Sequence, residues 1–135
     1  MTSVAEMVAA ARARITNLSQ TDFERERAGG EAVLIDVRDV RERWRDGTIP
    51  GARHVPRGMI EFWADPESKY HKDYLSPERR VILFCAAGMR SALAGAALRD
   101  LGYTNVAHLD TGLVGWKQAG GEVEAVPRPP VADAE

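Results

Sequence analysis

The sequence predicts an α/β domain with a mostly parallel sheet and helices on both of its faces. Short apolar segments alternate with amphipathic or alanine-rich segments along most of the chain, which is the pattern of consecutive strand–helix units. The strand candidates are almost wholly apolar, as in a sheet that is covered on both faces. With 135 residues, the chain is long enough for one domain with a substantial core and too short for two ordinary domains.

The amino-acid composition excludes several classes of protein. The 18 basic and 20 acidic residues give a net charge of −2 without a block of like charges, so we expect no nucleic-acid and no membrane partner. No apolar run approaches the roughly 20 residues that span a bilayer, and residues 1–15 lack the pattern of a secretory signal. Cys85 is the only cysteine, which excludes an internal disulfide and favours a reducing, cytoplasmic location. Because His54, His71 and His108 are scattered along the sequence, we expect no metal and no cofactor.

Residues 1–18 are predicted to form a helical extension ahead of the main domain. Its apolar residues recur at spacings of three and four, which places them on one stripe of a helix: Val4, Met7, Val8, Ala11, Ile15 and Leu18. The stripe either folds back on the domain or pairs with a second copy, so the sequence allows a monomer or a homodimer. A short second helix begins at Ser19 or Thr21 and ends at Gly29 and Gly30.

The rest of the chain alternates regularly between strands and helices. Four strand–helix pairs are predicted, at 32–36 with 40–46, 53–55 with 59–64, 81–85 with 90–102, and 105–110 with 113–120. Trp44 is expected to pack inward from its helix. Residues 65–80 are polar and hold two prolines, which is typical of a surface connection. The main domain is predicted to span 19–125, and the proline-rich tail 126–135 is predicted to be disordered.

Cys85 lies where the clearest strand meets the clearest helix. Residues 85–90 therefore form a tight loop at the carboxyl end of a strand, the edge at which open α/β sheets bind ligands. Backbone N–H groups at the start of a helix lack partners inside it and attract anions. Gly88 allows the loop to curve sharply, and Arg90 adds a permanent positive charge. A thiol in this field ionises readily, so the pattern favours a nucleophile in an anion cradle over a buried, inert cysteine.

Three motifs resemble signatures of the rhodanese family. The loop CAAGMRS is similar to that family's active-site loop, Cys-x-x-Gly-x-Arg-Ser. LIDVRDVRERWRDGTIPGARHVP (34–56) and LDTGLVGWKQAGGEVE (109–124) resemble its opening and closing signatures, except that Thr48 stands where the family often has histidine. The resemblance covers residues 19–125. It implies a rhodanese-like three-layer α/β/α fold with a mainly parallel sheet, to which this chain adds an N-terminal helix.

The resemblance also implies a sulfurtransferase. Cys85 would take a sulfane sulfur from thiosulfate or a thiol persulfide, hold it as a persulfide, and pass it to cyanide, a thiol or a partner protein. Cys85 and Arg90 would be catalytic, and the remaining loop residues would bind the substrate: Ala86, Ala87, Gly88, Met89 and Ser91. Ser91 either donates a hydrogen bond toward the sulfur or caps the following helix. Met89 either packs against the domain or faces a soft acceptor.

Two other functions fit the same loop. One is a sulfur-relay or redox-sensing module without turnover, and the other is a rhodanese-fold phosphatase. Four residues separate Cys85 from Arg90, whereas five separate them in the phosphatases of that fold, and no general acid is evident. The loop carries no cation besides Arg90, so thiosulfate is expected to be a poor donor.

Structural roles are predicted for several residues outside the loop. Asp36 and Arg38 end a strand on the same edge as Cys85, and they are expected to form an ion pair that locks the loops or to shape the pocket. Phe62 and Trp63 either line the pocket or pack in the core. His108 lies within a strand and is interpreted as a hydrogen-bonded core histidine.

Overall fold

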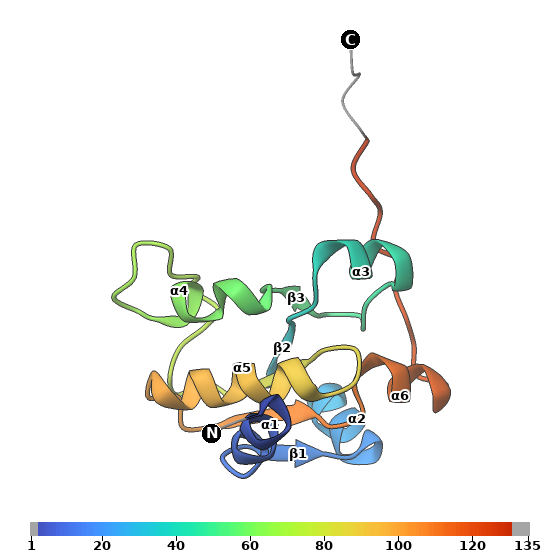
Figure 1. Ribbon diagram of the computed structural model, residues 1–135. Coiled ribbons are helices and arrows are strands. Elements are labelled where there is room, and N and C mark those ends of the chain that lie inside the picture. The colour runs from blue at the N-terminus through green and yellow to red at the C-terminus, as the bar shows by residue number, and fades with distance from the viewer. Residues whose placement is uncertain (1–2, 131–135) are drawn as a thin grey trace.

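The computed structural model describes residues 3–130 and shows an α/β fold (Figure 1). Its sheet has five parallel strands in the order β1-β5-β4-β2-β3, with β1 at Thr16–Leu18, β2 at Val33–Asp36, β3 at Arg53–His54, β4 at Val81–Phe84 and β5 at Val106–Leu109. The helices of this part of the chain are α1 (Val4–Arg12), α2 (Gln20–Gly29), α3 (Val40–Asp46), α4 (Ile60–Ala64), α5 (Met89–Asp100) and α6 (Gly112–Gln118), with a 3-10 turn, η1, at Arg57–Met59.

The helices form one layer on each face of the sheet, as predicted. Side chains alternate along the strands, so Ile35 and Leu83 face a core that α4 and α5 cover. Leu34 and Ile82 face a second core, which α2 and α6 close with Phe23, Leu113 and Trp116. The three inner strands, β2, β4 and β5, are buried throughout, because both of their faces are covered. The three-layer α/β/α class is therefore confirmed.

The N-terminal prediction was only half right. Helix α1 ends at Arg12, and Thr16–Leu18 pairs in parallel with Ala107–Leu109 as the edge strand β1. Val8 and Ala11 pack against Ala92 of α5, so the stripe folds back on the domain (Figure 1). Leu18 fitted the helical spacing by coincidence, since it faces the core beneath α2. A three-residue strand is too short to show a period of two in the sequence, and β5 supplies the pairing that stabilises it.

Helix α3 also departs from its prediction, because it buries no side chain. Trp44 is only partly exposed, yet its ring meets the Arg128 guanidinium 5.2 Å away instead of entering the core. The helix is instead fixed at its start by a capping box, in which the Asp39 side chain accepts from the helix backbone and Glu42 accepts from the Asp39 N–H. Helix α3 follows β2 at the carboxyl edge of the sheet, and its Glu42 reaches Arg90 of α5.

The remaining predictions need small changes. Ser19 caps α2, and no helix or strand occurs between α4 and β4. Residues 126–130 contain no regular element, and residues 131–135 of the predicted disordered tail lie outside the described residues. None of the helices within residues 3–130 has the length and apolar character needed to cross a membrane.

Candidate active site

Cys85 directly follows β4, at the carboxyl edge of the sheet and beside the ends of β2 and β5. Its side chain is buried, with 1% exposed. The loop leading to α5 is held from below by the start of α6, since the Leu113 N–H donates to the Cys85 carbonyl and the Val114 N–H donates to the Ala86 carbonyl, at 2.8 and 3.0 Å. Cys85 is therefore held in place by a strand and two helices.

Two glycines let the loop close this tightly. Gly88 has φ of 96°, and a Cβ there would lie 2.2 Å from the Asp110 carbonyl oxygen. Gly112 has φ of 64°, and a Cβ there would lie 2.4 Å from the Ala86 carbonyl oxygen. Both positions combine a left-handed backbone with a backbone contact, so only glycine fits without a shift. The curvature predicted for Gly88 is observed.

The sulfur of Cys85 accepts hydrogen bonds from backbone donors of its own loop. The N–H groups of Gly88 and Ser91 point at Sγ from 3.1 and 3.4 Å. Within residues 3–130, the N–H groups of four other loop residues donate no hydrogen bond: Ala86, Ala87, Met89 and Arg90. These groups lie at the N-terminus of a 12-residue helix, whose dipole favours negative charge. The arrangement suits a thiolate and a small anionic group bound to it.

Ser91 is not the helix cap that one alternative required, because α5 begins at Met89 and its N-cap is Gly88. Ser91 is buried, and its Oγ lies 3.5 Å from Cys85 Sγ and 2.7 Å from Nδ1 of His108. The interpretation of His108 as a hydrogen-bonded core histidine is confirmed, since it is fully buried and its Nε2 contacts the Asn17 Oδ1 at 2.7 Å. The sequence did not suggest that this histidine connects to the reactive loop.

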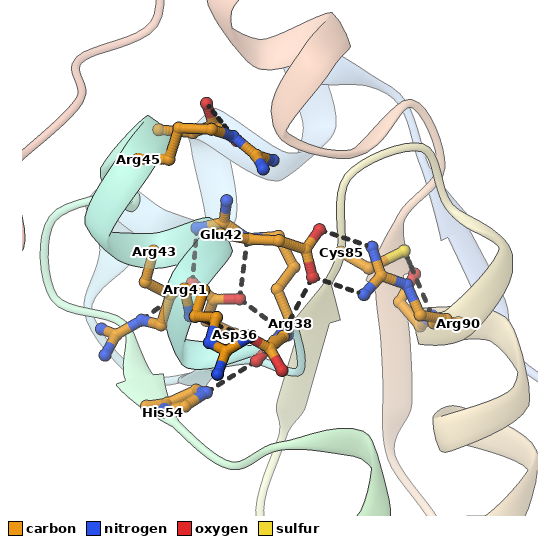
Figure 2. A network of polar contacts seen from close by, with 12 residues as sticks. Asp36, Arg38, Arg41, Glu42, Arg43, Arg45, His54, Cys85 and Arg90 are labelled. Carbon is orange, nitrogen blue, oxygen red and sulfur yellow. Dashed lines mark hydrogen bonds and ion pairs between the residues drawn. The ribbon is translucent and has the colours of Figure 1, made fainter.

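The Arg90 guanidinium is bound by a carboxylate (Figure 2). Its Nη1 and Nη2 donate to the two oxygens of Glu42 at 2.7 and 2.9 Å. This paired hydrogen bond lowers the pKa of Glu42 and raises the pKa of Arg90, so both groups are charged at neutral pH. The positive charge expected beside Cys85 is present, but it is largely balanced by Glu42, which sequence reasoning missed.

A second cluster lies deeper at the same edge. Arg38 donates through Nε and Nη2 to the two oxygens of Asp36, at 3.0 and 2.8 Å, and both side chains are buried. Arg43 donates to Asp36 Oδ2 at 3.1 Å (Figure 2). Thr48 donates to the same oxygen at 2.8 Å. Arg38 also donates to the Gly47 carbonyl, so the predicted ion pair does tie together the chain around α3.

The aromatic and apolar candidates match the expectations only in part. Phe62 is exposed, whereas Trp63 packs against the core between α4 and α5. Met89 is 56% exposed at the crest of the loop, so the interpretation that it packs against the domain was wrong. Ala87 beside it is also exposed. The crest therefore presents a small apolar surface to an approaching molecule.

Comparison with known proteins adds the family to this geometry. A model of the rhodanese-like domain family matches residues 19–119. A probable adenylyltransferase/sulfurtransferase of Mycobacterium tuberculosis is 36% identical over 89 residues, which are 66% of this chain and 21% of that protein, so the chain spans only about a fifth of that relative. A putative mitochondrial thiosulfate sulfurtransferase of Schizosaccharomyces pombe is 32% identical over 114 residues, covering 76% of this chain and 80% of that one.

A solved structure resembles the chain over nearly its whole length. It is a protein of unknown function from Rhodopseudomonas palustris, described as a possible tyrosine phosphatase. The two chains share 38% sequence identity with a TM-score of 0.86, over 92% of this chain and 96% of that one. A phosphatase therefore needs to be weighed against sulfur transfer on the chemistry of the loop.

Proposed function

The chain belongs to the rhodanese-like domain family, and from this premise we propose that it moves a sulfane sulfur from a donor to a thiophilic acceptor through a persulfide on Cys85. The position of Cys85 Sγ carries the proposal. Two backbone N–H groups already point at the sulfur, and within residues 3–130 four more N–H groups of the same loop donate no hydrogen bond. These donors would stabilise first the thiolate and then the terminal sulfur of the persulfide.

The reaction needs no group beyond the donor and the acceptor. The Cys85 thiolate attacks the outer sulfur of the donor, the donor's sulfur–sulfur bond breaks, and the leaving sulfite or thiolate keeps the electron pair. Transfer to the acceptor reverses these roles, because the acceptor attacks the terminal sulfur and Cys85 leaves as a thiolate. The buried donors favour the thiolate in both steps.

The charges of Glu42 and Arg90 beside Cys85 favour a sulfur donor with little negative charge. Glu42 neutralises the guanidinium of Arg90, whose side chain is 41% exposed, so the loop offers only a weak field to a dianion such as thiosulfate. The persulfide group of a thiol persulfide carries one negative charge at most, and the carbon next to its sulfur atoms can pack against the exposed side chain of Met89. We therefore propose a thiol persulfide as the preferred donor, and a thiol or a partner protein as the acceptor.

A phosphatase is the second candidate, because of the Rhodopseudomonas palustris structure. Phosphate-ester hydrolysis needs a protonated group to donate to the leaving oxygen. Glu42 is the carboxylate bound to the loop arginine, and its lowered pKa keeps it ionised at neutral pH, so it does not supply that proton. The six-residue loop from Cys85 to Arg90 is also one residue shorter than in the phosphatases of this fold.

Mass spectrometry of the intact protein tests these candidates directly. Incubation with a thiol persulfide is expected to add the mass of one sulfur, which a reductant removes, and C85S is expected to remain unmodified. Catalytic release of thiocyanate from cyanide would indicate an enzyme with turnover, whereas loading without release would indicate a sulfur-relay module. Hydrolysis of an aryl phosphate by the wild-type chain but not by C85S, without any sulfur loading, would contradict the proposal.

Other properties are proposed from the same chemistry. A single thiol kept for nucleophilic work suits a reducing compartment, so we propose a cytoplasmic location. We also propose that 19–125 is the rhodanese-like unit and that residues 1–18 are added to it, as α1 together with β1 rather than as one helix.

A further inference from the structure

A line of hydrogen bonds runs from the edge of the sheet to the reactive sulfur. It connects Asn17 of β1, His108 of β5, Ser91 of α5 and Cys85, with contacts of 2.7, 2.7 and 3.5 Å in that order. His108, Ser91 and Cys85 are all buried. Buried polar groups in such a series must each act as donor or acceptor in a consistent way, so the direction of every hydrogen bond can be determined.

Asn17 determines which nitrogen of His108 carries the hydrogen. The Asn17 Nδ2 group donates to the carbonyls of Arg12 and Ile15, at 2.9 and 3.3 Å. Carbonyl oxygens only accept, so the amide nitrogen must face them and the amide oxygen must face His108. The Nε2 atom of His108 therefore carries the hydrogen and donates it to Asn17 Oδ1.

The neutral ring then fixes the hydroxyl of Ser91. Burial lowers the pKa of His108 to about 4; the Asp110 carboxylate opposes this shift and the Arg12 guanidinium adds to it. A neutral imidazole with hydrogen on Nε2 has a bare Nδ1, so Ser91 must donate its hydroxyl hydrogen to Nδ1. The lone pairs of Ser91 Oγ are left to face Cys85. Ser91 thus accepts a hydrogen bond from the thiol, which is the reverse of the donation to the sulfur predicted as one alternative.

We propose that His108 receives the proton of Cys85 through the hydroxyl of Ser91 when the thiol becomes a nucleophile, and that Asn17 positions His108 for this task. The S–H bond of Cys85 breaks as a bond from Ser91 Oγ to that hydrogen forms, while the original hydroxyl hydrogen of Ser91 moves to Nδ1. No oxidant or further reactant is involved. The inference rests on the sulfur-transfer function proposed above. It makes His108 and Asn17 positioning residues, because neither contacts the reacting sulfur.

Burial disfavours an isolated cation on His108, so the proton can stay on the ring only while Cys85 carries a negative charge. The proton reaches the ring as negative charge appears on Cys85, so the buried pair stays neutral as a whole. The Asp110 carboxylate lies 3.6 Å from His108 Nε2, and Arg12 lies 3.2 Å from the same carboxylate oxygen. Arg12 and Asp110 are the charged groups that act on His108. Together they leave the site close to neutral, so the proton can return when Cys85 leaves as product.

Nitrogen NMR of the wild-type chain tests the first part of the proposal without any substitution. With labelled histidine at neutral pH, His108 is expected to carry hydrogen on Nε2 and none on Nδ1. The opposite tautomer, or a charged ring at neutral pH, would overturn the relay. The rate of sulfur loading is also expected to slow in deuterated water, because a proton moves in the loading step.

Substitutions test the second part. S91A and H108Q are expected to load sulfur from a thiol persulfide about 100-fold more slowly than wild type near neutral pH. The deficit should shrink at alkaline pH, where hydroxide removes the proton, and S91T should restore most of the rate. H71Q is the control, because His71 is a partly buried histidine whose ring, within residues 3–130, has one hydrogen bond, to the Leu75 carbonyl.

The outcomes separate this inference from the function on which it rests. If the wild-type chain never gains a sulfur, the proposed function fails. If the wild type loads sulfur and S91A loads it at the same rate with the same pH profile, only the relay is overturned. A loss in S91A that is constant across pH and not restored in S91T would indicate a structural effect and would also overturn the relay.

Discussion

Two arginine–carboxylate clusters lie at the same edge of the sheet and differ mainly in burial. Asp36 and Arg38 are almost completely buried, and Arg43 and Thr48 complete the hydrogen bonds of Asp36. Glu42 and Arg90 have the same paired geometry, but their side chains are 20% and 41% exposed. The loss of one member of the buried cluster would leave an uncompensated charge inside the protein, so the fold depends on the cluster being complete. The outer pair can exchange with water or a ligand, so it sets the charge seen by a substrate.

Breaking the buried cluster is expected to have the largest effect. D36N leaves Arg38 and Arg43 with too little negative charge in a buried site, and the free energy of unfolding should fall by about 3–5 kcal/mol. Urea denaturation followed by circular dichroism would measure the change. D100N is the matched control, because the Asp100–Arg14 pair is exposed and its loss should cost less than about 1 kcal/mol. A loss as small as that of D100N would contradict the structural role of Asp36.

His108 is a third buried polar group, and unlike Asp36 and Arg38 it is uncharged in the folded protein at neutral pH. Its pKa is lowered to about 4 by burial and is about 6.5 when unfolded, so the unfolded chain binds the extra proton first as the pH falls. The free energy of unfolding is therefore unaffected by His108 above about pH 6.5 and falls as the pH drops from 6.5 to about 4. The loss amounts to about 3 kcal/mol.

Denaturation between pH 7 and pH 4 would measure this dependence. H108Q should show a flatter decline than wild type over this window, whereas H71Q should follow wild type. Equal slopes for H108Q and wild type would contradict the lowered pKa of His108.

Removing the charge of the outer pair should change specificity more than stability. E42Q keeps a side-chain acceptor for the capping box, so α3 should remain intact and stability should change by less than about 1 kcal/mol. Freed from its counter-charge, Arg90 should speed loading from thiosulfate about 10-fold. Loading from a neutral persulfide should barely change. Equal gains for both donors would show that Glu42 acts through shape instead of charge.

A positive charge introduced at Met89, at the exposed turn of the Cys85 loop, should have the smallest effect. It tests again whether local charge sets the rate of loading from thiosulfate. M89K alters an exposed side chain, so its effect on stability should stay within about 0.5 kcal/mol. It should raise thiosulfate loading only about threefold, because water and salt screen an exposed charge. High salt should abolish this gain. A gain that persists in high salt would point to a direct contact with the donor.

The features predictable from the sequence are the local ones. The strand β4, the helix α5 and the loop between them are visible because an apolar run, a glycine, an arginine and an alanine-rich run follow one another within 20 residues. The same segment was sufficient to locate Cys85 among backbone donors. Local patterns of this kind need no knowledge of which segments meet in space.

The missed features all depend on distant partners. Glu42 binds an arginine 48 residues away, and Asn17 binds a histidine 91 residues away. The capping box from Asp39 to Glu42 was readable from the sequence, but it identifies Glu42 only as part of a helix start. Strand β1 was missed for the same reason, because its three residues become a strand only by pairing with β5.

The position of Asn17 on β1 has a consequence for how proteins of this fold are compared. The match to the family begins at residue 19. Asn17, which orients His108 in the proposed relay, lies before that match. A version of the chain that starts at residue 19 would keep every residue of the reactive loop and lose the amide that orients His108. Two proteins with identical loops can thus differ in thiol reactivity, because the difference is encoded in a neighbouring edge strand.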